Sequence, residues 1–139
     1  MKLVTLVLVA VAACGGAPAK PAAAPAAKPF SMKNYYLVLL KRGPAWTPEQ
    51  TEETKRLGAG HMANIQAMGA AKKLVLAGPT DVPETDRTAV AGIFILDAKD
   101  PAEVAALLAN DPAIAAGRLV PEVLPWYGPA GITFDGATP

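Results

Sequence analysis

Hydrophobic residues recur along this chain with two periods, and the change between them separates the predicted elements. Runs rich in branched and aromatic residues are typical of strands, and they occur at about 34–40, 74–79, 89–96 and 119–127. Apolar residues three and four apart predict a long helix over 48–70 and a shorter helix from Asp100 onward. The chain therefore alternates between strand and helix patterns.

Three short segments contain the signals that start helices. Thr47-Pro48-Glu49-Gln50 matches a capping box, with Thr as N-cap and Pro at the first helical position. Asp100-Pro101-Ala102-Glu103 repeats this signature. Asp111-Pro112 predicts a further short turn of helix, which Gly117 can end.

The order of elements is β-α-β-β-α-β, which predicts an α+β chain with a ferredoxin-like antiparallel sheet and both helices on one face. Pro121 and Pro125 lie four residues apart, which favours an edge position for the last strand. The third strand is apolar on both faces, with Phe94 and Leu96 on one and Ile93 and Ile95 on the other. Because an uncovered apolar face normally marks an interface, we expect a homodimer with two sheets face to face.

Residues 1–29 lack these patterns. Lys2 precedes an apolar run over 3–13 that is too short to cross a bilayer and is typical of a signal peptide. The run ends in Val11-Ala12-Ala13-Cys14, which resembles a lipobox, so residues 1–13 are predicted to be removed and Cys14 to carry lipid such as palmitate. The alternative is an ordinary secretory signal with an incidental cysteine.

Residues 14–29 consist of Cys14 followed by Gly, Ala, Pro and Lys, which cannot bury enough apolar surface to fold. They are predicted to be a tether, with the folded domain over 30–139. We therefore expect a protein anchored through Cys14 to membrane lipid in the bacterial cell envelope. Gly15 stands where an Asp commonly retains lipoproteins in the inner membrane, so the outer membrane is favoured.

Charge and composition exclude several classes of partner and cofactor. Three of the 13 basic residues precede residue 30, whereas all 12 acidic residues follow it, so the domain is slightly acidic. This argues against nucleic acid as a partner. Cys14 is the only cysteine, so no intrachain disulfide or thiolate metal site is expected. No Gly-rich phosphate loop is present, and we predict no metal and no cofactor.

His61 is the only histidine, and it shares a helical face with Leu57, Ile65 and Met68. A structural histidine bonded to the backbone is one interpretation. The other pairs it with Asp111, whose simpler role is to cap the helix after Pro112. If the side chains meet, the carboxylate would orient the ring for general acid–base catalysis.

Several short motifs in order carry a family resemblance. They are Tyr35-Tyr36-Leu37-Val38, the mid-helix His61, Leu76-Ala77-Gly78-Pro79, and Asn110-Asp111-Pro112 followed by Ala116-Gly117. Residues 34–127 thereby resemble the YciI-like (YCII-related) domains of the dimeric α/β-barrel group. The resemblance implies a His61–Asp111 active-site dyad and lyase or isomerase chemistry on small molecules. A non-catalytic binding or structural module in the envelope is the alternative.

Overall fold

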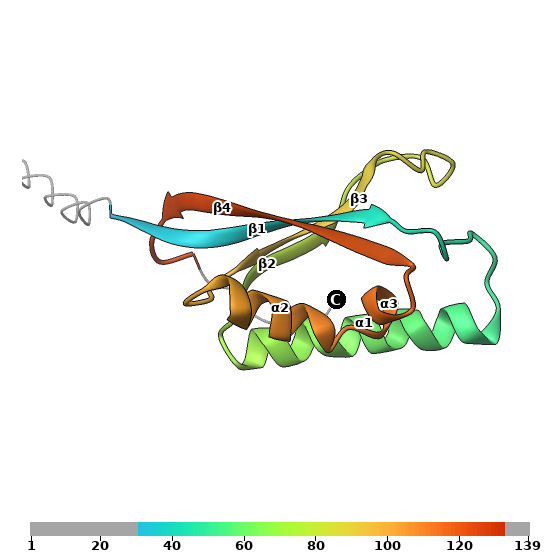
Figure 1. Cartoon of the computed structure of the whole chain (residues 1–139), viewed down its shortest axis with the longest axis horizontal. Coiled ribbons are helices and arrows are strands. Elements are labelled where there is room, and N and C mark those ends of the chain that lie inside the picture. Colours follow the sequence, from blue (N-terminus) through green and yellow to red (C-terminus); the bar gives the residue numbers. More distant parts are fainter. Residues whose placement is uncertain (1–30, 133–139) are drawn as a thin grey trace, which may run out of the picture.

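The predicted strands pair into one antiparallel sheet in the computed structural model, which describes residues 31–132. The strands lie in the order β2-β3-β1-β4, and every pair is antiparallel. All three helices lie on one side of the sheet (Figure 1). The ferredoxin-like α+β prediction is confirmed. The elements are β1 (Met32–Arg42), α1 (Glu52–Ala70), β2 (Leu74–Pro79), β3 (Val90–Leu96), α2 (Pro101–Ala109), α3 (Pro112–Ala115) and β4 (Leu119–Pro129).

The start of α1 differs from the prediction. The helix begins at Glu52, and the N-cap is Thr51, whose side chain accepts from the N–H of Thr54 at 3.2 Å. The predicted capping box at Thr47 is wrong because the Thr47 carbonyl accepts a hydrogen bond from Arg118 at 3.0 Å. That contact holds residue 47 in a loop, outside the helix.

The other predicted helix boundaries agree with the structure. Asp100 caps α2 by accepting from the N–H of Glu103, and Glu103 in turn accepts from the N–H of Lys99. Asp111 caps α3, and Gly117 follows that helix with a φ of 71°. Both prolines at the helix starts occupy the first helical turn, where the missing N–H has no partner to lose.

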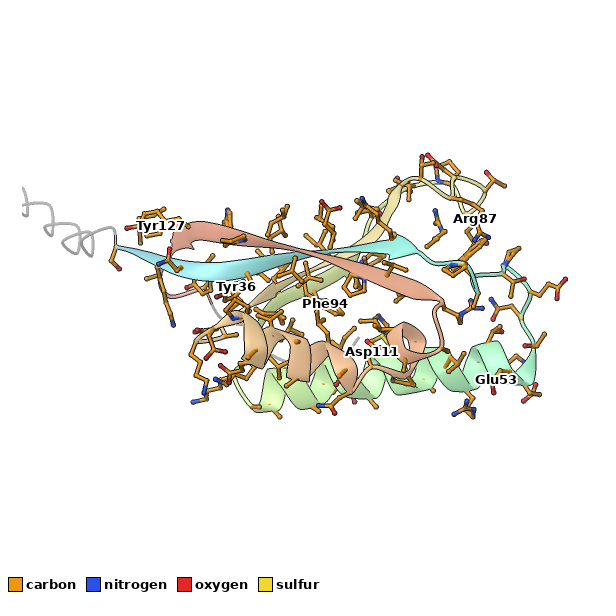
Figure 2. All side chains as sticks on the ribbon, in the orientation of Figure 1. Tyr36, Glu53, Arg87, Phe94, Asp111 and Tyr127 are labelled. Atoms are coloured by element: carbon orange, nitrogen blue, oxygen red, sulfur yellow. The ribbon has the colours of Figure 1, made fainter. Side chains whose placement is uncertain are left out.

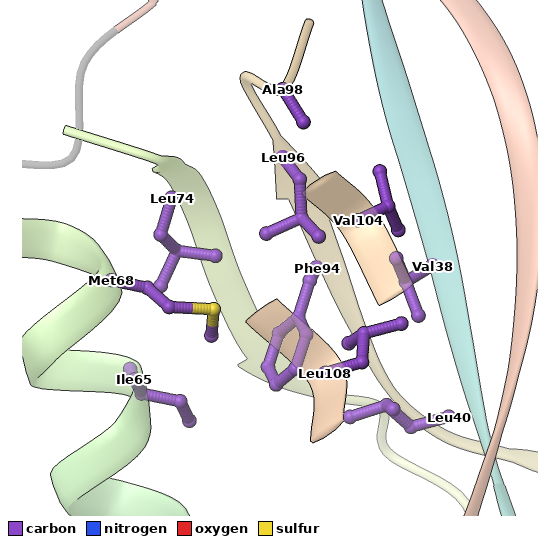
Figure 3. Packing of buried hydrophobic residues seen from close by; sticks show 10 residues of the cluster. All are labelled: Val38, Leu40, Ile65, Met68, Leu74, Phe94, Leu96, Ala98, Val104 and Leu108. Carbon is purple, nitrogen blue, oxygen red and sulfur yellow. The ribbon is translucent and has the colours of Figure 1, made fainter. Parts of the chain in front are cut away.

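The hydrophobic core lies between the sheet and the helices. Val38 and Phe94 are direct partners across β1 and β3, and both are almost completely buried. Figure 3 shows these side chains meeting those of α1 and α2. The cluster comprises Val38, Leu40, Ile65, Met68, Leu74, Phe94, Leu96, Ala98, Val104 and Leu108.

The opposite face of the sheet carries a second set of apolar side chains without a helix over it. Leu37 pairs with Ile95 and Leu124, and Leu39 pairs with Ile93, so these residues share that face. In the single chain, Leu124 keeps 39% of its surface exposed. The structure thus confirms that β3 is apolar on both faces, whereas the homodimer stays a prediction.

Candidate functional site

His61 lies near the middle of α1, on the face that packs toward the sheet. Leu57, Ile65 and Met68 of the same face are all buried, as the helical spacing predicted. Asp111 lies at the start of α3, and its side chain has no exposed surface. Its backbone N–H donates to the carbonyl of Leu108 at the end of α2. This hydrogen bond fixes Asp111 in the turn between α2 and α3.

The two side chains meet although they are 50 residues apart in the sequence. The distance between His61 Nδ1 and Asp111 Oδ2 is 2.6 Å. The second carboxylate oxygen, Oδ1, accepts from the backbone N–H groups of Ala113 and Ile114 at 2.9 and 3.4 Å. Asp111 therefore has both roles that the sequence left open, as N-cap of α3 and as partner of His61.

The geometry decides which histidine nitrogen carries the proton. An ionised carboxylate only accepts hydrogen bonds, so Nδ1 is the donor and a neutral His61 keeps its lone pair on Nε2. The ring lies almost parallel to that of Phe94, with centroids 5.8 Å apart and an angle of 23° between the planes. Its side chain keeps 19% of its surface exposed. One carboxylate bond and one ring contact thus hold the imidazole while part of it stays accessible.

The pKa of Asp111 is lowered in the folded protein by opposing effects. Burial is the largest and raises the pKa, because it disfavours the charged carboxylate. The hydrogen bond from His61, its charge, and the N–H groups of Ala113 and Ile114 lower the pKa and together outweigh burial. Asp111 is therefore a carboxylate at neutral pH, as the assigned tautomer requires.

A glycine that the sequence analysis did not single out brings the two helices together. A Cβ at Gly60 would overlap Cγ of Pro112, so α1 and α3 approach more closely here than an alanine would allow. Gly60 precedes His61 and Pro112 follows Asp111, so the close approach places the two candidate side chains next to each other. The signal in the sequence was a helix-weakening Gly inside a strong helical pattern.

Two cavities described in the structure are lined by residues other than His61 and Asp111. One, of about 390 Å³, lies between α2, α3 and β4 and is lined by apolar side chains, Ile114 and Val123 among them. The other, of about 370 Å³, lies beyond the C-terminal end of α1. Neither is lined by His61 or Asp111.

Residues 31–132 contain no group of three or more His, Cys, Asp or Glu side chains that could hold a metal ion. Within the same range, no helix is both long and apolar enough to span a bilayer. Cys14, the predicted signal over 1–13 and the tether over 14–29 lie outside the described residues.

No curated protein matches this chain, whereas solved structures similar to it exist. One such structure is that of 5-chloro-2-hydroxyhydroquinone dehydrochlorinase (TftG) from Burkholderia phenoliruptrix AC1100, in complex with 2,5-dihydroxybenzoquinone. It is 26% identical, with 66% of this chain and 92% of that chain covered and a TM-score of 0.48. The family model of the YCII-related domain matches residues 35–127, and the chain therefore belongs to the YCII-related domain family.

Proposed function

We propose that this protein is an envelope enzyme, anchored through Cys14, that moves a proton on a small organic molecule as a lyase or isomerase. The observation that carries the proposal is the 2.6 Å contact between His61 Nδ1 and the fully buried Asp111 carboxylate. Membership of the YCII-related domain family supports the proposal, because the resemblance to that family implies chemistry on small molecules.

In the proposed mechanism, His61 is the acid–base catalyst and Asp111 its orienting partner. Neutral His61 takes a proton from the substrate at Nε2, and the electron pair of the broken bond stays on the substrate. The imidazolium that forms keeps its Nδ1–H bond to Asp111, whose negative charge stabilises it. The proton then goes to another substrate atom in an isomerase, or leaves with the displaced group in a lyase.

The rest of the site supports this use of the ring. Asp111 is held by two backbone N–H groups as well as by His61, so the carboxylate has a defined position. Nε2 has no hydrogen-bond partner within residues 31–132 and is the nitrogen available to a substrate. A histidine tied at both nitrogens would lack this capacity.

The alternative is a binding or structural module in which the same contact only joins α1 to α3. The partial burial of His61 favours that alternative. In that case the protein binds a ligand and releases it without changing it chemically. The two functions differ in a measurable way, because only the enzyme exchanges protons with its ligand.

Proton exchange provides the test. The full chain is incubated in D₂O with a panel of small carbon acids, such as hydroxyquinones and β-keto acids, and deuterium uptake is followed by NMR. We expect exchange by the wild type that falls by about 10²–10⁴-fold in His61→Gln, as for removal of a general acid–base group. Asp111→Asn should reduce exchange as well while keeping the cap on α3. Exchange in the wild type equal to that in His61→Gln for every compound would reject the enzyme.

A further inference from the structure

A second cavity, of about 370 Å³, lies at the end of the molecule where α1 passes into β2. Its wall includes Gly69 from the end of α1, Lys72 from the turn after that helix, Lys33 and Tyr35 from β1, and Asp97 just after β3. Gly69 follows His61 by eight residues, which is about 12 Å along a helix. The volume falls within the range of small-molecule sites, and the cavity is separate from the proposed catalytic pair.

The floor of this cavity is apolar and well packed. Tyr35, Leu74 and Val75 line it, and each keeps no more than 5% of its surface exposed. The Tyr35 hydroxyl donates to the carbonyl of Pro129 at 3.1 Å, so its polar end is already bonded. The floor therefore offers a ring and aliphatic carbons to a ligand.

The rim is polar and carries a net positive charge. Lys33 Nζ lies 2.6 Å from Asp97 Oδ2, so these two charges compensate each other. The Asp97 carboxylate raises the pKa of Lys33 by accepting its hydrogen bond, which keeps the ammonium charged. Lys72 is exposed and has no carboxylate within ion-pairing distance in residues 31–132. Its charge is therefore the uncompensated one at this cavity.

The backbone of Lys72 adds an independent observation. Its φ of 57° is the only positive value at a non-glycine residue within 31–132. Glycine adopts this conformation with less strain, so a lysine at this position lowers the stability of the folded state. The lysine does, however, place an ammonium group at the rim of the cavity. Such strain is a reason to look for a function of the side chain itself.

The C-terminal end of α1 repels a bound anion less than a helix end whose last carbonyl groups have no hydrogen-bond donors. The N–H groups of Ala71, Lys72 and Lys73 donate to the carbonyls of Ala67, Gly69 and Met68, respectively. These three carbonyls are therefore already bonded at the C-terminal end of the helix. The positive charge of Lys72 is therefore the main electrostatic attraction for an anion at this cavity.

We propose that this cavity binds a small organic monoanion, with a ring or short apolar body against Tyr35, Leu74 and Val75 and its carboxylate at Lys72. This site is independent of the catalytic proposal, because neither His61 nor Asp111 lines the cavity. A carboxylate fits because it can accept from the ammonium while its body removes apolar surface from water.

Sodium benzoate is the probe, and benzyl alcohol is the uncharged control. In an NMR titration of the full chain, benzoate should give saturable shifts at Tyr35, Leu74 and Val75, and benzyl alcohol should bind about tenfold more weakly. Lys72→Gln should weaken benzoate binding by about tenfold. Lys55→Gln, which removes the charge of another exposed lysine near the other end of α1, should leave it unchanged.

A second variant separates lost binding from lost folding. Lys72→Gly should also lose benzoate binding, but it should raise the thermal midpoint, because glycine accepts the positive φ without strain. His61→Gln should bind benzoate as the wild type does. The proposal is overturned if benzoate and benzyl alcohol bind alike, if Lys72→Gln keeps full affinity, or if the shifts centre on His61.

Discussion

Asp111 is the residue on which most of the candidate site depends. Its Oδ1 caps α3 through Ala113 and Ile114, and its Oδ2 contacts His61. A charged group without exposed surface is stable only when its hydrogen-bonding capacity is used, and here both oxygens have partners. Removing one partner therefore affects the ionisation of the carboxylate as well as the contact itself.

We predict that His61→Gln narrows the pH range over which Asp111 stabilises the fold. A carboxyl group with a lowered pKa stabilises the folded state above its unfolded pKa of about 3.9, and that contribution is lost as the pH falls further. Without His61, two of the effects that lower the pKa of Asp111 are lost, so this pKa rises. The difference in free energy of unfolding between the wild type and His61→Gln should be fully present above about pH 5 and shrink as the pH falls below about pH 4.

Urea denaturation at a series of pH values measures this difference. Met62→Gln is the control, because Met62 is the next residue on α1 and is 47% exposed. Its difference from the wild type should not change with pH. A pH-independent difference for His61→Gln as well would mean that His61 does not influence the ionisation of Asp111.

At the scale of elements, the contact between α1 and α3 places the two side chains together. α3 is a single short turn, Pro112–Ala115, so its position is determined by what lies on either side of it. Gly60 allows Pro112 to approach α1, and on the other side the N–H of Ala45 donates to the carbonyl of Gly117. The distance between the His61 and Asp111 side chains is thus determined by how α3 packs against α1.

We predict opposite effects from two neighbouring glycine substitutions in α1. Gly58→Ala should stabilise the protein by about 0.5–1 kcal/mol, because nothing lies within 4 Å of the added Cβ and alanine favours the helix. Gly60→Ala should destabilise it by about 1–3 kcal/mol, because the Cβ overlaps the rigid ring of Pro112.

Chemical denaturation measures both stabilities, and ¹⁵N NMR of the His61 ring reports whether Nδ1 keeps its partner. In Gly60→Ala the Nδ1 signal should move toward that of a free imidazole, while Gly58→Ala should match the wild type. If the two alanine variants were equally stable, with unchanged ring signals, the close approach at Gly60 would not control the site.

At the scale of the whole molecule, we propose that the apolar sheet face is covered by a second copy of the chain. Leu124 and Leu76 are about 40% exposed on this face, and Ile93 and Ile95 extend the same surface. We predict that the purified protein sediments as a dimer at micromolar concentration. Leu124→Lys should sediment as a monomer, since a buried unpaired lysine is unfavourable at such an interface.

Met62→Lys provides the matched control, because it introduces the same charge at an exposed apolar residue on the helix side. It should remain a dimer, and circular dichroism should be the same for both variants. A monodisperse wild-type monomer would contradict the proposed sheet-to-sheet interface.

The proposed anchor also belongs to this scale, because it determines where the domain acts. We predict that Cys14→Ser abolishes incorporation of radiolabelled palmitate, since serine offers no thioether to acylate, and shifts the protein to an uncleaved or soluble form. Fractionation and labelling of the full chain provide the measurement. Unchanged labelling together with unchanged membrane association would contradict the lipoprotein interpretation.

The sequence by itself determined the order and type of the elements, because the signals for them are local. Strand β2 was predicted with its observed bounds, and the caps at Asp100 and Asp111 were predicted from residues within one helical turn. The start of α1 was misassigned because Thr47 and Thr51 carry similar local signals. The long-range bond from Arg118 to the Thr47 carbonyl distinguishes them.

Only the tertiary structure decided the arrangement around His61. The sequence named both His61 and Asp111 as candidates, but their 2.6 Å contact joins residues 50 positions apart. It depends on how α1 packs against α3 at Gly60 and Pro112. The cavity beside Lys72 also joins parts of β1, α1, β2 and the segment after β4. Local patterns determine elements, whereas such distances follow from the packing of side chains that are remote in the chain.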